Sequence, residues 1–162
     1  MAKTKQFDTH IDLKGKVRDQ MITLLNQQLA DTFDLYSQTK QAHWNVKGAQ
    51  FYALHELYDD LAAKLLEPID EIAERVTALG GSAHGTIHMA AEMSRLPDFP
   101  LVVNGMESVQ ALVERYATVA GSTRAAIDTA DEVGDMGTAD LFTGLSRELD
   151  KALWFLEAHV QA

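Results

Sequence analysis

The stretch FYALHELYDDLAAKLLEPIDEIAERVTALGG, residues 51–81, repeats apolar side chains at intervals of three and four residues. That spacing is typical of an amphipathic helix with one buried face. Gly80 and Gly81 are suited to end such a helix. Pro68 lies inside the pattern, so we expect a kink or a restart there, because proline removes a backbone hydrogen bond. The apolar positions are Leu54, Leu57, Leu61, Leu65, Ile72, Val76 and Leu79.

The same helical period occurs before this stretch, from about residue 15 to about residue 44. Asn45 and Gly48 follow it, and both residue types tolerate the left-handed backbone conformation that ends helices. The first 14 residues do not continue the period. We therefore expect residues 1–14 to form a flexible N-terminal tail and residues 15–162 to form the folded domain.

After the stretch, residues 81–104 read as a long crossover with at most one short helix, near residues 84–93. Asn104 and Glu107 form a possible capping box that opens a third amphipathic helix. A fourth helical stripe covers residues 141–160. A crossover this long joins parallel neighbours more naturally than an antiparallel hairpin. The sequence thus predicts an all-α four-helix bundle whose one long crossover, between the second and third helices, holds a short extra helix.

The composition is that of an ordinary globular protein, with 162 residues, 46% of them hydrophobic and 23% charged. No run of about 18 apolar residues occurs, and the N-terminus has no apolar stretch after its basic residues. The sequence therefore predicts neither a transmembrane helix nor a secretory signal, and we expect a cytoplasmic protein that can associate with the nucleoid.

Two features of the composition restrict the chemistry. The chain has no cysteine, which excludes disulfides and thiolate sites and leaves imidazole and carboxylate as the strong metal ligands. That pair of donors suits iron, zinc or manganese. The formal net charge of −10 disfavours nonspecific binding of nucleic acid, because contacts with phosphate supply most of that affinity.

Four polar residues of the 51–81 stretch are candidate metal ligands. His55 with Asp59, and Asp70 with Glu74, are each four residues apart, so each pair shares one helix face. Asp70 lies eleven positions after Asp59, and eleven steps along a helix return to within about 20° of the same face. The two pairs are nevertheless about 16 Å apart along the helix, far beyond metal–ligand bonds of about 2 to 2.5 Å. One helix therefore cannot close one site.

A two-fold axis solves this problem. An antiparallel copy of the helix places His55 and Asp59 of one subunit beside Asp70 and Glu74 of the other, and an isologous interface does so twice. His43, at the end of the first predicted helix, can add a ligand to each site. Two imidazoles and three carboxylates suit ferrous iron, and three negative charges favour a site for more than one cation.

The ordinary explanation of such residues is a solvated helix face without metal. His55 and Asp59, however, interrupt an otherwise apolar neighbourhood. Paired carboxylates near a buried seam would have raised pKa values unless a cation were present. We therefore favour a metal site. A metal-free helical bundle, which would bind no iron, is the alternative.

Four segments are also similar to one known family. They are KQAHWNVKG (residues 40–48), FYALHELYD (51–59), DEIAERVTALGG (70–81) and TADLFTGLSRELDKALWFLEAHV (138–160). In wording and spacing they resemble the Dps family, the ferritin-like DNA-binding proteins from starved cells, and the resemblance covers nearly the whole chain after about residue 15.

That resemblance implies a function. In the Dps family a ferroxidase centre lies at the two-fold interface of a hollow dodecamer, where ferrous iron is oxidised, in many members with hydrogen peroxide in preference to oxygen, and ferric mineral collects in the cavity. Other divalent cations such as zinc can substitute. Such a protein protects DNA from oxidative damage. The implied ligands here are His43, His55 and Asp59 from one subunit with Asp70 and Glu74 from its mate.

An acidic segment marks a candidate pore for iron. Asp131 and Glu132 lie near the end of the third predicted helix, and Asp135 and Asp140 follow closely. Repeated around a three-fold axis, Asp131, Asp135 and Asp140 would attract cations, and the resemblance implies an acidic pore in this region. The alternative is a solvated turn in which Asp135 is a helix N-cap.

Other residues carry weaker hypotheses. Trp44 follows the first ligand and can act next to the site as a second-shell residue, although core packing is favoured. His84 and His88 form another pair four residues apart, with Glu92 as the only nearby carboxylate, and suggest a second metal site. His10, between two aspartates, is a weaker candidate because termini are usually mobile.

DNA binding remains an alternative function, that of a nucleoid-compacting protein with a secondary metal site. The N-terminal segment carries a small excess of basic residues, which many copies on one particle would multiply. The net negative charge of the subunits repels the phosphates of DNA, so we expect weak DNA binding at physiological salt. The basic residues are Lys3, Lys5, Lys14, Lys16 and Arg18.

Overall fold

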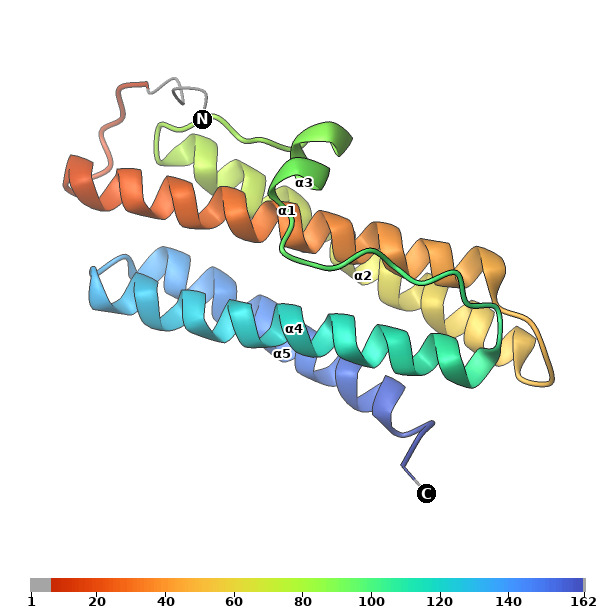
Figure 1. The fold of residues 1–162 in the computed structure, drawn as a ribbon. Helices are drawn as coiled ribbons and strands as arrows, with labels where there is room; N and C mark the ends of the chain where they lie inside the picture. The colour runs from red at the N-terminus through yellow and green to blue at the C-terminus, as the bar shows by residue number, and fades with distance from the viewer. Residues whose placement is uncertain (1–6, 162) are drawn as a thin grey trace.

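The computed structural model describes residues 7–161, and within that range the chain forms five helices and no strand (Figure 1). The prediction of an all-α fold is thereby confirmed. In that range no helix is both long enough and apolar enough to cross a membrane.

Four long helices form a bundle of two pairs. Helix α1 (Gly15–Asn45) lies beside α2 (Phe51–Ala78), and α4 (Gly105–Glu132) lies beside α5 (Met136–Glu157), as Figure 1 shows. The pairs join because α1 also packs on α4 and α2 on α5. The apolar stripes of the sequence meet in this interior, which confirms the four predicted helices.

The long crossover between α2 and α4 runs the length of the bundle and contains the predicted short helix, α3 (Ile87–Met93). It leaves at the end where α1 begins. It ends beside the α1–α2 loop, where the backbone N–H of Lys47 donates to the carbonyl oxygen of Val103 at 2.8 Å. Helices α2 and α4 therefore run parallel, as a crossover of this length predicts.

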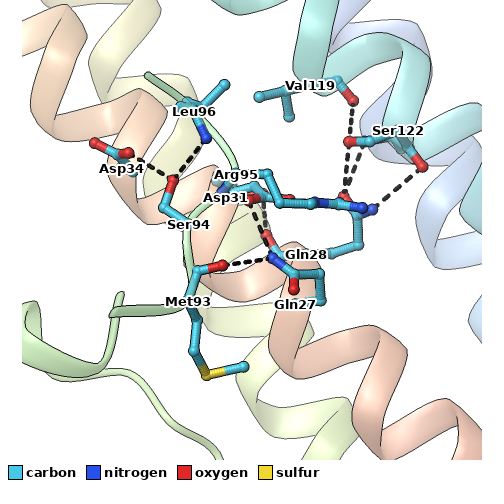
Figure 2. A network of polar contacts seen from close by, with 12 residues as sticks. Gln27, Gln28, Asp31, Asp34, Met93, Ser94, Arg95, Leu96, Val119 and Ser122 are labelled. Atoms are coloured by element: carbon cyan, nitrogen blue, oxygen red, sulfur yellow. Dashed lines mark hydrogen bonds and ion pairs between the residues drawn. The ribbon is translucent and has the colours of Figure 1, made fainter. Parts of the chain in front are cut away.

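A polar network fixes the crossover to α1 (Figure 2). Asp31 of α1 is buried, and it accepts hydrogen bonds from the backbone N–H and the guanidinium of Arg95, with N–O distances of 2.8 Å for the backbone and for Nε. Ser94 donates through Oγ to Asp34 at 2.6 Å. A buried carboxylate is stable only when paired in this way, so these contacts hold the segment in one position.

Helix α2 continues through Pro68 without a break, so the possible restart there is wrong. The helix ends at Ala78, and Gly80, two residues later, has a φ of +87°, which is accessible to glycine but strained for other residues. A Cβ at Gly80 would also lie 2.5 Å from the carbonyl oxygen of Phe7. Glycine is thus required both for the turn and for the close approach of the N-terminal segment.

Part of the predicted flexible tail lies on the bundle. Within residues 7–14, Ile11 and Leu13 pack against the core, and the segment is hydrogen-bonded to the end of α2. The tail is therefore anchored over these residues. Lys3 and Lys5, which carry the DNA-binding hypothesis, lie outside the described residues.

Two tyrosines are buried inside the bundle with their hydroxyl groups paired. Tyr58 Oη lies 2.7 Å from Ser108 Oγ, and Tyr116 Oη lies 3.3 Å from Thr39 Oγ1. Burial raises the pKa of Tyr58 to about 12 and raises that of Tyr116 as well. Both side chains are therefore neutral packing groups, and each tyrosine joins two helices across the core.

Candidate metal centre

His43 and His55 face each other across the α1–α2 junction, with stacked rings whose centroids are 3.8 Å apart. His43 Nδ1 donates to the carbonyl oxygen of His55 at 2.8 Å, and His55 Nδ1 donates to that of His43 at 3.0 Å. Because a carbonyl oxygen can only accept, the ring proton of each histidine sits on Nδ1. In the neutral form of each imidazole, Nε2 then carries the lone pair that a metal ion requires.

Asp59, one turn beyond His55 on α2, completes the first half-site. Its Oδ1 lies 3.9 Å from Nε2 of His43 and 2.5 Å from Nζ of Lys40, a residue of α1. The hydrogen bond from Lys40 lowers the pKa of the Asp59 carboxyl below its usual value. Asp59 is therefore ionised, and the Lys40 ammonium occupies the cationic position beside it.

Asp70 and Glu74, the second half-site, lie further along α2 and are both exposed. Within residues 7–161, no hydrogen bond or ion pair involves either of their carboxylate groups. Carboxylates without an internal partner are available to a cation or to another subunit. By contrast, the carboxylates of Asp31 and Asp135 are buried and form ion pairs within the chain.

The two half-sites do not meet within one chain. Among residues 7–161, no group of three histidine, aspartate or glutamate side chains is arranged so that it could hold a metal ion. This agrees with the separation of about 16 Å that the helical rise predicts between the pairs. His43, His55 and Asp59 lie near one another but are not arranged to hold a metal ion by themselves, and Asp70 and Glu74 lie further along α2.

Trp44 does not pack in the core of the subunit, so the packing role favoured from the sequence is wrong for the single chain. Its side chain is 65% exposed. The ammonium group of Lys40 lies 5.7 Å from the centroid of the Trp44 ring, within the range of a cation–π contact. Trp44 thus contacts the first half-site through Lys40, as a second-shell residue would.

The acidic segment divides into exposed and buried members. Asp131 at the end of α4 and Asp140 near the start of α5 are exposed, as a pore would require. Asp135 is 2% exposed and caps α5 by accepting from the backbone N–H of Thr138 at 3.0 Å. It also accepts from Arg75 Nη2 at 2.6 Å. The pore role predicted for Asp135 is therefore wrong, and the N-cap alternative is confirmed.

A surface hollow of about 380 Å³ joins the second half-site to the exposed end of the acidic segment. It contains both Glu74 and Asp140, which lie on different helices and far apart in the sequence. Exposed carboxylates therefore extend from the start of α5 to the candidate ligands of α2. Its lining residues are Glu71, Glu74, Arg75, Ala78, Gly137, Asp140 and Leu141.

The other histidines are not assembled into sites. His84 precedes Thr86, the N-cap of α3, so His84 and His88 do not share a helix face as their spacing had suggested. His88 and His10 are exposed. Within residues 7–161, none of the three belongs to a group that could hold a metal ion.

Sequence reasoning missed two residues that act next to the candidate ligands. Lys40 is three residues before His43, which places it on the same face of α1, and that spacing could have identified it. Arg75 follows Glu74 and pairs with buried Asp135, and no local signal predicts this contact because sixty residues separate the two. The sequence also does not predict that the backbone carbonyl group of each histidine, His43 and His55, accepts a hydrogen bond from the other's ring.

Known proteins that resemble this chain in sequence agree with one another in family. The family model of the ferritin-like domain matches residues 22–162. A DNA protection during starvation protein of Agrobacterium fabrum is 48% identical over 97% of this chain and 98% of its own. A protein of the same name from Brevibacillus brevis is 32% identical over 92% of this chain and all of its own.

Solved structures give the same answer. DpsC of Streptomyces coelicolor superposes with a TM-score of 0.92 at 33% identity, covering 98% of this chain and 93% of its own. A Dps protein of Vibrio cholerae, described as one of the ferritin-like diiron-carboxylate proteins, superposes at 0.89 with 27% identity, over 94% and 96% of the two chains. This chain belongs to the ferritin-like proteins and, among them, to the Dps family of mini-ferritins.

Proposed function

We propose that this protein oxidises ferrous iron at sites shared by two subunits, and stores the ferric product in a hollow shell that shields DNA from oxidative damage. The observation that carries the proposal is the division of the candidate ligands into two half-sites, one at the α1–α2 junction and one further along α2. Two histidines with free Nε2 atoms and an ionised aspartate form one half-site, and two unpaired carboxylates form the other. A two-fold pair of subunits joins the halves twice.

The chain's own residues supply coordination and charge. The imidazoles of His43 and His55 are held in one orientation by the carbonyl groups that accept from Nδ1, so they lose little freedom when they bind iron. The carboxylates of Asp59, Asp70 and Glu74 hold the iron and favour the ferric state through their negative charge. The chemistry is electron transfer. Two ferrous ions reduce one hydrogen peroxide to two water molecules, with uptake of two protons.

Lys40 has a role in the state without iron. Its ammonium group neutralises Asp59 at a distance of 2.5 Å, where a metal ion would also bind. Iron must therefore displace Lys40, and the released ammonium remains near the face of Trp44. Lys40 thus keeps Asp59 ionised and in place before iron arrives.

Iron reaches the centre along carboxylates. We propose that Asp131 and Asp140 line a three-fold pore of a dodecamer, and that the hollow joining Asp140 to Glu74 leads from that pore to the site. An acidic path of this kind concentrates cations and raises their rate of arrival. The proposal is supported by the exposure of both aspartates and by the presence of Asp140 and Glu74 in one hollow.

DNA binding is expected to be weak, because the net charge is −10 and residues 7–14 lie on the bundle rather than free. In gel retardation at about 0.15 M salt, the particle is expected to leave linear DNA unshifted. A Lys14→Ala/Lys16→Ala variant serves as a matched control for removal of Lys3 and Lys5. A shift at that salt that disappears only without Lys3 and Lys5 would contradict this expectation.

An anaerobic titration tests the function. Ferrous iron is added without oxygen, hydrogen peroxide follows, and the particle mass is measured on the same sample. We expect saturable binding of about two iron ions per site, then a rise in ferric absorbance, from an assembly larger than a monomer. Zinc, which has no redox chemistry, is expected to fill the site and suppress the rise. Oxidation at the full rate by a monomer would overturn the proposal.

A further inference from the structure

A second hollow, of about 450 Å³, lies between α1 and the crossover, and we call it the crossover hollow. One wall is a stripe of α1 that runs from Asp34 to Trp44. The other wall comes from α3 and from the segment after it, as far as Phe99. Its volume lies within the range of about 300 to 1,000 Å³ that small-molecule sites occupy. None of the residues that line it is a candidate iron ligand.

The crossover hollow is negatively charged. Asp34 and Asp98 both line it, and none of its lining residues is basic. Asp34 is half-buried, and its carboxylate accepts from neutral groups alone. Ser94 Oγ donates at 2.6 Å, Gln38 Nε2 at 3.1 Å and Ser37 Oγ at 3.4 Å, and Figure 2 shows the contact with Ser94. The carboxylate is therefore held in position while it keeps its full charge.

Asp34 differs in this respect from the two buried aspartates of the bundle. Asp31 pairs with Arg95, and Asp135 pairs with Arg75. Within residues 7–161, no ion pair involves Asp34. A charge that is partly withdrawn from water is stabilised by a counter-ion. The wall of the crossover hollow therefore presents a fixed carboxylate that lacks one.

Arg115 lies behind the crossover hollow and does not line it. Its guanidinium is buried and donates to Gln38 Oε1 and to the carbonyl oxygen of Asp98, both at 3.0 Å. It also lies 3.5 Å from a carboxylate oxygen of Glu114, outside the hollow. Arg115 therefore orders two of the lining residues, and its own charge has a counter-ion elsewhere.

The crossover hollow also has an apolar surface. Trp44 is exposed, and Leu96 and Phe99 are half-buried. Among residues 7–161, no three histidine, aspartate or glutamate side chains are arranged to hold a metal ion, so the two carboxylates do not form a metal site. A cation with an apolar body gains from the carboxylates and from the apolar surface together. The lining therefore fits an organic ammonium ion.

We propose that the crossover hollow binds a free alkyl diamine. Its ammonium groups donate to the carboxylates of Asp34 and Asp98, and its hydrocarbon chain lies against Trp44, Leu96 and Phe99. Two carboxylates without a basic neighbour in the lining match two ammonium groups. The site is separate from the proposed iron site and does not depend on the proposed function. Because the ligand contacts both walls, its binding stabilises the packing of the crossover on α1.

Equilibrium dialysis of the assembled particle against butane-1,4-diamine tests the proposal. We expect saturable binding of about one diamine per subunit at about 0.15 M salt. Butane-1,4-diol has the same chain without the charges, and Mg²⁺ has the charge without the chain. Each is expected to bind at least about 10-fold more weakly. A lysine of a second copy in the crossover hollow would exclude the diamine, so absence of saturable binding would overturn the proposal.

Asp34→Asn keeps the shape of the side chain and removes its charge, so it is expected to weaken diamine binding by about 10-fold. Asp98→Asn is expected to weaken it by about threefold, because Asp98 is exposed. The Asp98 carboxylate makes no contact within residues 7–161, so this variant retains the test if Asp34→Asn lowers the helical content.

Asp128→Asn is the matched control, because Asp128 is an exposed aspartate of α4 outside the crossover hollow. It removes the same charge and is expected to leave diamine binding unchanged. If Asp34→Asn and Asp98→Asn bind the diamine as tightly as Asp128→Asn does, the diamine is attracted by the net charge of the particle alone and the proposed site is wrong.

Discussion

Replacement of Asp70 or Glu74 by alanine is expected to slow the peroxide-dependent oxidation of ferrous iron by about 100-fold or more, because even residues that only support a metal ligand are worth about 10- to 100-fold. Each substitution removes one of the two carboxylates that the second half-site supplies. Neither side chain has an internal partner within residues 7–161, so folding is expected to be unaffected. The measurement is the initial rate of ferric absorbance after peroxide is added to iron-loaded protein.

Asp60→Ala is the control for this prediction. It removes the same charge from the same helix, and Asp60 is exposed like Asp70, but its position lies off the ligand stripe. Its rate is expected to stay within about twofold of the original, since surface substitutions away from a site have small effects. Equal rates for Asp60→Ala and Asp70→Ala would show that oxidation occurs elsewhere.

Asp135→Ala is expected to lower the free energy of unfolding by about 2 to 4 kcal/mol, because it removes a helix cap and one partner of a buried ion pair. The Asp135 carboxylate is 2% exposed and accepts from Thr138 and Arg75. Arg75, whose side chain is 23% exposed, would lose its carboxylate partner while still partly covered. Urea or thermal unfolding, followed by circular dichroism, measures the loss.

Asp131→Ala provides the comparison for stability, since Asp131 is exposed at the end of the preceding helix and has no such network. Its effect is expected to stay within about 0.5 kcal/mol. A loss below about 1 kcal/mol for Asp135→Ala would mean that the cap and the ion pair contribute little.

The four long helices could be predicted from the sequence because their apolar side chains recur every three or four residues over many turns. The predicted ends of the helices agree with the observed ends to within a few residues, for example near Asn45 and near Gly80. Pro68 was misjudged as a possible restart. The missing hydrogen bond of one proline is a local cost, and packing of the apolar stripe on both sides of Pro68 outweighs it.

The candidate ligands could be predicted because spacing on a helix is a geometric statement that holds before the fold is known. His43, His55 and Asp59 lie near one another in the structure, and their role as metal ligands stays a prediction. The contacts that tune this group could not be predicted. The carbonyl groups that orient the two imidazoles carry no side-chain signal, and the role of Lys40 depends on how closely α1 and α2 approach.

The acidic segment illustrates a different limit. Asp131, Asp135 and Asp140 look equivalent as sequence, yet only Asp135 points into the molecule, because Arg75 from α2 lies beside the α4–α5 turn. A partner sixty residues away decides which aspartate is structural. Long-range pairing of this kind follows from the packing of helices and not from a local pattern.

The central claim, that each iron site is divided between two subunits, is tested most directly by mixing two inactive variants. One variant, His55→Ala/Asp59→Ala, lacks the first half-site, and the other, Asp70→Ala/Glu74→Ala, lacks the second. In a mixed pair one of the two sites receives both intact halves, so random co-assembly is expected to restore about a quarter of the original oxidation activity. Activity of the mixture no higher than that of either variant alone would contradict a site shared across the interface.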